Sequence, residues 1–281
     1  MTSVPASGAR PARRPNRGLR RYLPSALTVA AYVILIIAVA PLIIVFGTAL
    51  NAETMAFPPR IWTLDWMVAA ITDERFVVGA LNSAVVAGVA AALSTGFALP
   101  IALLVNRLPV RYARIVSLAF LGPLLVPSII FALALYQVMV FTVGSANPLA
   151  LMIGHVIITL PFPVRTVTAA TEDLDPALHD AAASVGARPL YAFWRITFPL
   201  LKPGIVAGFL FAFLVSWNDF NISIFLSPYS YQLLPIKIYE YLLYDYKPVV
   251  AAVAAWSVIG TGALIMLIDR LVGLNVFIGK R

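Results

Sequence analysis

The sequence predicts an all-α, polytopic membrane protein with six transmembrane helices, and three observations support this prediction. Of the 281 residues, 61% are hydrophobic and only 11% are charged, whereas about a quarter of a soluble domain is charged. Six apolar runs each approach the roughly 20 residues that a helix needs to cross the hydrocarbon core. The lysines and arginines gather between alternate runs. A membrane β-barrel would instead need shorter segments that alternate polar and apolar residues.

The six apolar runs divide the chain. They cover residues 23–50, 77–105, 115–141, 148–167, 204–225 and 249–272. Residues 1–22 are rich in proline, glycine, serine and arginine, so we expect a disordered basic tail there. A signal peptide also begins with a basic stretch, but the first run greatly exceeds its roughly 7–15 apolar residues. We therefore expect a first transmembrane helix and an outer loop over 23–76, a membrane core over 77–272 and a tail over 273–281.

The second run carries a small residue at every fourth position. These residues are Ala84, Gly88, Ala92 and Gly96. Such a stripe lets another helix approach closely, so it predicts helix packing and not chemistry.

Positively charged residues favour the cytoplasmic side of a membrane, and their distribution predicts the orientation. One side carries four of them, namely Arg60, Arg75, Lys237 and Lys247. The other 16 of the 20 lie in the terminal segments and around the remaining two connections. We therefore expect an inner-membrane protein with both termini in the cytoplasm. The asymmetry also accounts for the net charge of +8, so the charge gives no reason to expect a nucleic-acid partner.

The chain lacks the residues that several kinds of functional site require. The chain has no cysteine, which excludes disulfides, thiolate metal sites and cysteine nucleophiles. It has no G-x-x-x-x-G-K-[ST] loop, so we do not expect it to bind ATP, to contain catalytic residues or to be an enzyme. Its two histidines are His155, expected to be packed or pore-facing, and His179, expected to be solvated. We therefore expect neither a metal site nor a cofactor.

The inward-facing connection over 168–203 predicts a short helix that lies outside the membrane. Asp175 and Pro176 form a favourable helix start, and Gly186 suits the left-handed position that ends a helix. Between them the apolar positions recur at helical spacing, at Leu178, Ala181, Ala182 and Val185. This amphipathic helix, over about 176–187, needs either its own bundle or a groove in a partner to cover its apolar stripe. Pro189 then begins a second helix that runs to Pro199 at the membrane.

The same connection resembles a signature of the permease subunits of binding-protein-dependent ABC importers. That signature is Glu-Ala-Ala, three residues, Gly, nine residues and Ile-x-Leu-Pro. The chain has Asp180-Ala181-Ala182, then Gly186, then Ile196-Thr197-Phe198-Pro199, so every spacing matches. Asp180 replaces Glu and has a shorter side chain, and Phe198 replaces Leu. The resemblance implies a type I (MetI-like) importer permease fold with its transmembrane domain over 77–272. It also implies that Asp180, Ala181, Ala182, Gly186, Ile196 and Pro199 couple to a cytoplasmic ATPase.

The resemblance covers nearly the whole chain and is closest to permeases of the spermidine/putrescine type. The segments that support it are Pro123 with Pro127, Asp180–Pro203, Ser227–Tyr231 and Leu234–Tyr239. It implies import of a polyamine or a similar nitrogenous solute, with an aminophosphonate or another small solute as the alternative. It further implies three partners within the lipid bilayer or beside it: a second homologous permease, an ATPase dimer that binds ATP and magnesium, and an extracytoplasmic solute-binding protein.

A polar cluster interrupts the fifth run at Trp217, Asn218, Asp219 and Asn221. Asp219 lies 17 residues after Lys202, or roughly 25 Å along a helix, so we expect it in the outer part of the membrane. Ionisable residues at such depth usually face a cavity or a partner. Three readings remain open: Asp219 lies at the headgroup level, pairs with a neighbouring helix, or lines the translocation pathway with the other three residues. An acidic group beside an aromatic ring would suit an ammonium substrate.

Two other classes of membrane protein fit the sequence less well. An ion-coupled secondary transporter would predict inverted repeats and paired ionisable residues near the midplane, and neither is evident. A membrane scaffold would not need the spaced loop signature. We therefore predict a transmembrane permease subunit of an ATP-driven importer.

Overall fold

The computed structural model describes residues 17–53, 55–144, 147–172, 174–175 and 177–272. Over these residues the chain is helical, with short loops and an isolated antiparallel bridge between Asn51 and Trp62. Five helices are long and apolar enough to cross a membrane, and a sixth span is counted if one bent pair is taken together. The predicted tail 273–281 and residues 1–16 of the predicted N-terminal tail lie outside the described residues.

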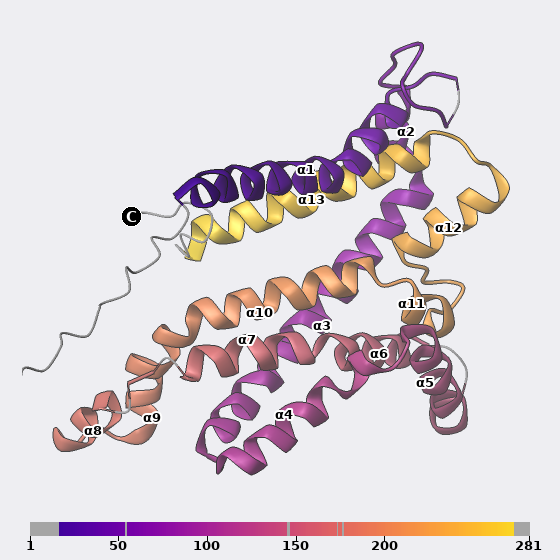
Figure 1. The fold of residues 1–281 in the computed structure, drawn as a ribbon. Helices are drawn as coiled ribbons and strands as arrows, with labels where there is room; N and C mark the ends of the chain where they lie inside the picture. The colour runs from indigo at the N-terminus through magenta and orange to yellow at the C-terminus, as the bar shows by residue number, and fades with distance from the viewer. Residues whose placement is uncertain (1–16, 54, 145–146, 173, 176, 273–281) are drawn as a thin grey trace, which may run out of the picture.

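The long helices run between two ends of the molecule (Figure 1). At one end α1 (Arg17–Ala49) begins, α13 (Val249–Val272) ends, and the short helix α8 (Ala177–Ser184) projects. At the opposite end lie α2 (Asp65–Thr72) and α12 (Leu234–Tyr244). Because α1 begins at Arg17, it includes the last part of the predicted tail 1–22.

Three helices form the centre of the bundle: α3 (Glu74–Arg107), α7 (Pro161–Glu172) and α10 (Phe198–Asn218), which all contact one another. The contact between α7 and α10 requires glycine. A Cβ atom added to Gly208 would lie 2.5 Å from Thr166 Oγ1 and 2.7 Å from Pro163 Cα. A side chain at this position would therefore push the two helices apart.

The face by which α3 packs is offset by one residue from the predicted stripe. Ala84, Ala92 and Gly96 are exposed, and a Cβ atom added to Gly88 or Gly96 would meet no atom within 4 Å. The buried small residues are instead Ser83, Ala87, Ala90, Ala91, Ser94, Ala98 and Ala102. The prediction that the stripe packs was therefore wrong for contacts within this chain, because α3 has small residues on more than one face.

The third predicted span, 115–141, is broken. The structure has α4 (Val110–Leu125) and α5 (Ser128–Val143), which are bent by 96° relative to each other. Pro127 causes the break, because it has no backbone N–H and disfavours the helical region for the residue before it. Val126 accordingly has the extended angles φ −96° and ψ 137°.

The fourth span is longer than predicted, since α6 (Pro148–Thr159) and α7 together form one span over Pro148–Glu172. The side chain of Asn147 caps its start by accepting from the backbone N–H of Ala150 at 2.9 Å. The fifth span, predicted over 204–225, covers Pro189–Asn218. It ends early, and a separate short helix, α11 (Asn221–Leu226), follows.

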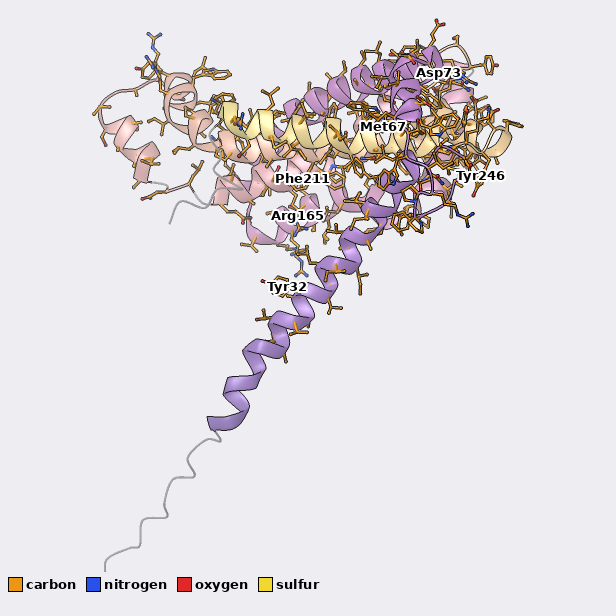
Figure 2. The ribbon with its side chains drawn as sticks, turned by 90° about the horizontal axis from the view of Figure 1, so that it is seen from above. Tyr32, Met67, Asp73, Arg165, Phe211 and Tyr246 are labelled. Carbon is orange, nitrogen blue, oxygen red and sulfur yellow. The ribbon has the colours of Figure 1, made fainter. Side chains whose placement is uncertain are left out.

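The connection between α1 and α3 is anchored by two tryptophans. Trp66 Nε1 donates a hydrogen bond to the backbone oxygen of the buried Asn51 at 3.0 Å. Trp256 Nε1, on α13, donates to the backbone oxygen of Met67 on α2 at 3.0 Å. The bond from Trp256 holds α2 against α13, and Met67 is labelled in Figure 2.

Candidate coupling and pathway sites

The predicted helix outside the membrane is present as α8, and both of its predicted end signals are used. At its start the backbone N–H of Ala177 donates to Asp175 Oδ1 at 2.9 Å. At its end Gly186 has the left-handed angle φ +73°. The backbone N–H of Gly186 donates to Ala183 O at 2.9 Å and that of Ala187 donates to Ala182 O at 3.0 Å. This pair of bonds is the Schellman motif, which fixes a sharp exit from the helix.

Little of the α8 stripe is buried within the chain. Ala182 is 6% exposed, but Leu178 is 39% exposed and Val185 is 82% exposed. Asp180, Ala181 and Gly186 are also exposed. Of the stripe, only Ala182 is buried, so the other positions form an exposed apolar surface of the kind that partners bind.

The second helix of this connection continues without interruption into the membrane. It passes from α9 (Pro189–Ala192) through a π-helical turn, Phe193–Thr197, into α10. The backbone N–H of Phe198 accordingly donates to Phe193 O, five residues back. Pro199 lies two residues after the turn, and a π turn can fit a proline that cannot continue the α-helical ladder. Within the signature, Ile196 is half-buried and Pro199 is exposed.

The structure places Asp219 in the gap between α10 and α11, and not inside a continuous helix as predicted. Its carboxylate Oδ2 accepts from the backbone N–H groups of Ile222 at 2.8 Å and Ser223 at 3.2 Å. Asp219 therefore caps the start of α11, which satisfies N–H groups that would otherwise have no partner in lipid. This cap also explains why the fifth span ends early.

The four residues of the polar cluster do not all line the same cavity. Trp217 and Asn218 line a cavity of about 690 Å³ together with Phe220 and Tyr239. Asn221 Nδ2 instead donates to Ser128 Oγ on α5 at 2.6 Å. The structure therefore assigns Asn221 to helix packing and leaves Trp217 and Asn218 beside open space.

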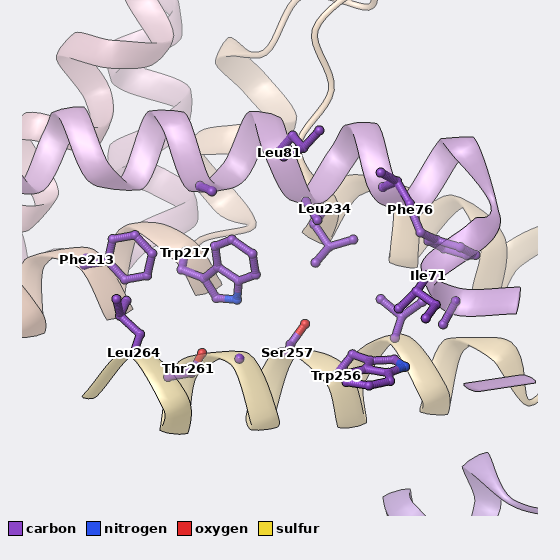
Figure 3. A pocket seen from close by; sticks show the side chains of 16 residues that line it. Ile71, Phe76, Leu81, Phe213, Trp217, Leu234, Trp256, Ser257, Thr261 and Leu264 are labelled. Atoms are coloured by element: carbon purple, nitrogen blue, oxygen red, sulfur yellow. The ribbon is translucent and has the colours of Figure 1, made fainter. Parts of the chain in front are cut away.

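Trp217 also lines a second, apolar cavity of about 510 Å³ between α3, α10 and α13. Figure 3 shows Trp217 and Phe213 on one side of this cavity, with Ser257, Thr261 and Leu264 of α13 opposite. The rings of Phe213 and Trp217 stack with centroids 6.0 Å apart.

A buried hydrogen-bond network lies beside the gap between α10 and α11, and no sequence pattern predicted it. His155 on α6 is fully buried, with Nδ1 2.7 Å from Ser216 Oγ and Nε2 3.3 Å from Ser223 Oγ. Ser223 Oγ donates in turn to the backbone oxygen of Asp219 at 2.7 Å. Of the two alternatives predicted for His155, packing is therefore the one observed. Its partners lie 61 and 68 residues away in the sequence. The periodicity of a helix therefore cannot predict these contacts.

Comparison with known proteins gives a family for this geometry. Residues 95–276 match the family model described as "Binding-protein-dependent transport system inner membrane component". The spermidine/putrescine transport system permease protein PotC of Haemophilus influenzae is 26% identical over 248 residues, which cover 88% of this chain and 95% of the relative. A putative ABC transporter permease protein, ORF1, of Streptomyces antibioticus is 30% identical over 205 residues, covering 70% and 86%.

Solved structures support the fold. A bacterial ABC transporter involved in the import of the acidic polysaccharide alginate has a chain with a TM-score of 0.69 at 17% identity, covering 90% of this chain and 96% of that one. A chain of the MetNI methionine ABC transporter, in an inward-facing conformation, has a TM-score of 0.58 at 20% identity, covering 70% and 94%. The protein is thus a multi-pass transport component and not itself an enzyme. The chain belongs to the binding-protein-dependent transport system inner membrane components, the permease subunits of ABC importers.

Proposed function

We propose that this permease imports a small polyamine or a similar cationic, nitrogenous solute. The support is that relatives named for spermidine/putrescine and putrescine transport match most of the chain, at 26% and 24% identity. An aminophosphonate is the alternative solute, but no contact in the structure favours it.

The path for such a solute passes the outer end of α10. Trp217 and Asn218 line the cavity of about 690 Å³, and the rings of Phe220 and Tyr239 stand in contact there with centroids 5.0 Å apart. Aromatic faces attract ammonium groups, and the Asp219 carboxylate lies next in sequence. In this proposal Trp217 and Asn218 contact the solute, Asp219 supplies negative charge, and Asn221 holds α11 to α5.

Coupling to ATP occurs through α8. The observation that carries this part is the exposed apolar surface of a helix whose ends are fixed by Asp175 and Gly186. Such a helix presents a rigid surface to a groove. Asp180, Ala181, Ala182 and Gly186 then contact a cytoplasmic ATPase dimer, which binds ATP and magnesium, while Ile196 and Pro199 carry the movement into α10.

The importer assignment also predicts the other subunits of the complex. A second homologous permease completes the pathway, and an extracytoplasmic binding protein delivers solute at the end that carries α2 and α12. Both termini lie in the cytoplasm, on the side of α8.

Reconstitution of the complete complex in liposomes tests the substrate. We expect putrescine or spermidine, added with the binding protein, to raise ATP hydrolysis and to accumulate on the far side of the membrane. A neutral sugar is the control and should do neither. Uptake of an aminophosphonate in place of both polyamines would refute the polyamine assignment while leaving the importer assignment intact.

A further inference from the structure

A pocket between α4 and α7 is lined by charged side chains, hydroxyl groups and an aromatic ring. Its volume is about 300 Å³. Arg165, Thr168 and Glu172 line it from α7, and Ser117 and Phe120 line it from α4. The positions on α7 are three and four residues apart, so they share one face of the helix.

Arg165 has no counter-charge in the part of the chain that the structure describes. Its side chain is exposed, and no carboxylate lies within 4 Å of it. Glu172 lines the same pocket but forms no ion pair with it. An arginine within an apolar span is costly unless it reaches an anion or the membrane surface.

Thr168 provides a second, independent observation. Its Oγ1 atom is buried and has no hydrogen-bond partner. Buried hydroxyl groups nearly always have a partner, so an oxygen-rich ligand in the pocket would supply the missing bond. Ser117 offers another hydroxyl group from the facing helix.

The pocket lies toward the α8 end of the molecule. Ser117 lies seven residues after the start of α4, and Arg165 lies seven residues before the end of α7. Both are therefore about 10 Å from the helix ends at the α8 side of the molecule. From this depth the long side chain of Arg165 can extend toward the membrane surface, where phospholipid phosphates lie.

We propose that this pocket binds a phosphate group, with Arg165 donating from its guanidinium and Thr168 and Ser117 from their hydroxyl groups. An anionic phospholipid of the leaflet on the α8 side supplies the phosphate, and its first apolar carbons lie against Phe120. Arg114, three residues before Ser117, adds positive charge on the same face of α4, which outweighs Glu172. Planar guanidinium groups favour phosphate because two N–H groups can bind two oxygens.

The test compares lipid retention by the purified, fully assembled complex in native mass spectra. The variants are Arg165→Gln, Arg165→Lys and Thr168→Val, and Arg60→Gln in the outer loop is the matched control for charge. We expect the wild type and Arg60→Gln to retain phosphatidylglycerol. Arg165→Gln should lose about tenfold in retention, as expected for a lost charge-assisted bond, and the other two variants should lose less.

A second measurement identifies the source of the phosphate. Thermal unfolding of the complex is followed in nanodiscs with and without phosphatidylglycerol, and in detergent with added inorganic phosphate. Stabilisation of the wild type by phosphatidylglycerol, absent in Arg165→Gln, supports the lipid source. Stabilisation by inorganic phosphate alone supports the phosphate site but assigns it to a free ion. Equal lipid retention in all variants, with no effect of either additive, would overturn the proposal.

Discussion

His155 links three helices through a defined set of donors and acceptors. Ser223 Oγ donates to Asp219 O, so its oxygen must accept from His155 Nε2. A neutral imidazole carries one proton, and therefore Nδ1 accepts from the hydroxyl group of Ser216. The neutral Nε2–H tautomer thus ties α6 to both sides of the Asp219 gap.

Two substitutions of His155 separate these two bonds. In His155→Gln the amide nitrogen can replace Nε2 and donate to Ser223, whereas in His155→Asn the shorter amide can reach only Ser216. Leaving a buried polar group without a partner costs about 1–3 kcal/mol. In His155→Gln the hydroxyl group of Ser216 loses its partner, whereas in His155→Asn the hydroxyl group of Ser223 still donates to Asp219 O. We therefore expect His155→Gln to lower the thermal stability of the purified complex more than His155→Asn does. Equal losses in both variants would show that the bond to Ser216 contributes nothing specific.

Asp219→Asn tests whether charge is needed at the gap. Asparagine caps helices about as well as aspartate, so the bonds to Ile222 and Ser223 can persist while the charge is removed. We expect solute uptake to fall, with assembly and basal ATP hydrolysis retained. Asp219→Ala removes the cap as well and should also lower stability by about 1 kcal/mol. Normal uptake and normal assembly in Asp219→Asn would remove the case for a cationic solute at this residue.

In the proposed complex, the end of α8 determines how that helix contacts the ATPase. Gly186 has φ +73° and no atom within 4 Å of an added Cβ, so backbone strain alone limits substitution. Asparagine tolerates the left-handed region, whereas a β-branched residue does not. We expect Gly186→Val to abolish uptake and weaken co-purification with the ATPase, and Gly186→Asn to retain most of both. Wild-type behaviour of Gly186→Val in both assays would refute the coupling role.

The elements that were predicted correctly are marked by residues at their own ends. Asp175 and Gly186 mark the two ends of α8, and both are used as predicted. The break at Pro127 was missed because apolar composition continues across it, although the proline itself was a valid signal. The end of α10 was missed for the same reason: the run stays apolar to Phe225, and Asp219 acts through the cap that it gives to α11.

Contacts between distant segments set the limit of prediction for the candidate site. The membrane replaces the polar and apolar faces of a soluble helix with a nearly uniform apolar surface, so periodicity says little about which face packs. The offset between the predicted stripe on α3 and its buried face illustrates this. The bonds of His155 to Ser216 and Ser223, and of Asn221 to Ser128, likewise depend on tertiary packing.

At the scale of the whole molecule, the first part of α1 is not covered by the other helices. Residues 26–39 of α1 are exposed, and Figure 2 shows this part of the helix, with Tyr32, extending away from the rest of the chain. The later part of α1 packs against α13, where Val45, Phe46 and Ala49 join a buried cluster. A helix with a wholly apolar surface is stable in lipid without further contacts, so this arrangement is consistent with a membrane environment.

The arrangement of the two ends predicts the topology. The start of α1, the end of α13 and α8 share one end of the molecule (Figure 1), and the basic residues gather on that side. The chain has no cysteine, so single cysteines can be labelled without background. We expect Arg111→Cys and Arg188→Cys to react with a membrane-impermeant maleimide only after the inner membrane is opened. Asp65→Cys and Asp245→Cys, both exposed, should react once the outer barrier alone is permeable. Labelling of Asp245→Cys only from the side of Arg111 would contradict the six-span topology, because it would place α12 on the same side as α8.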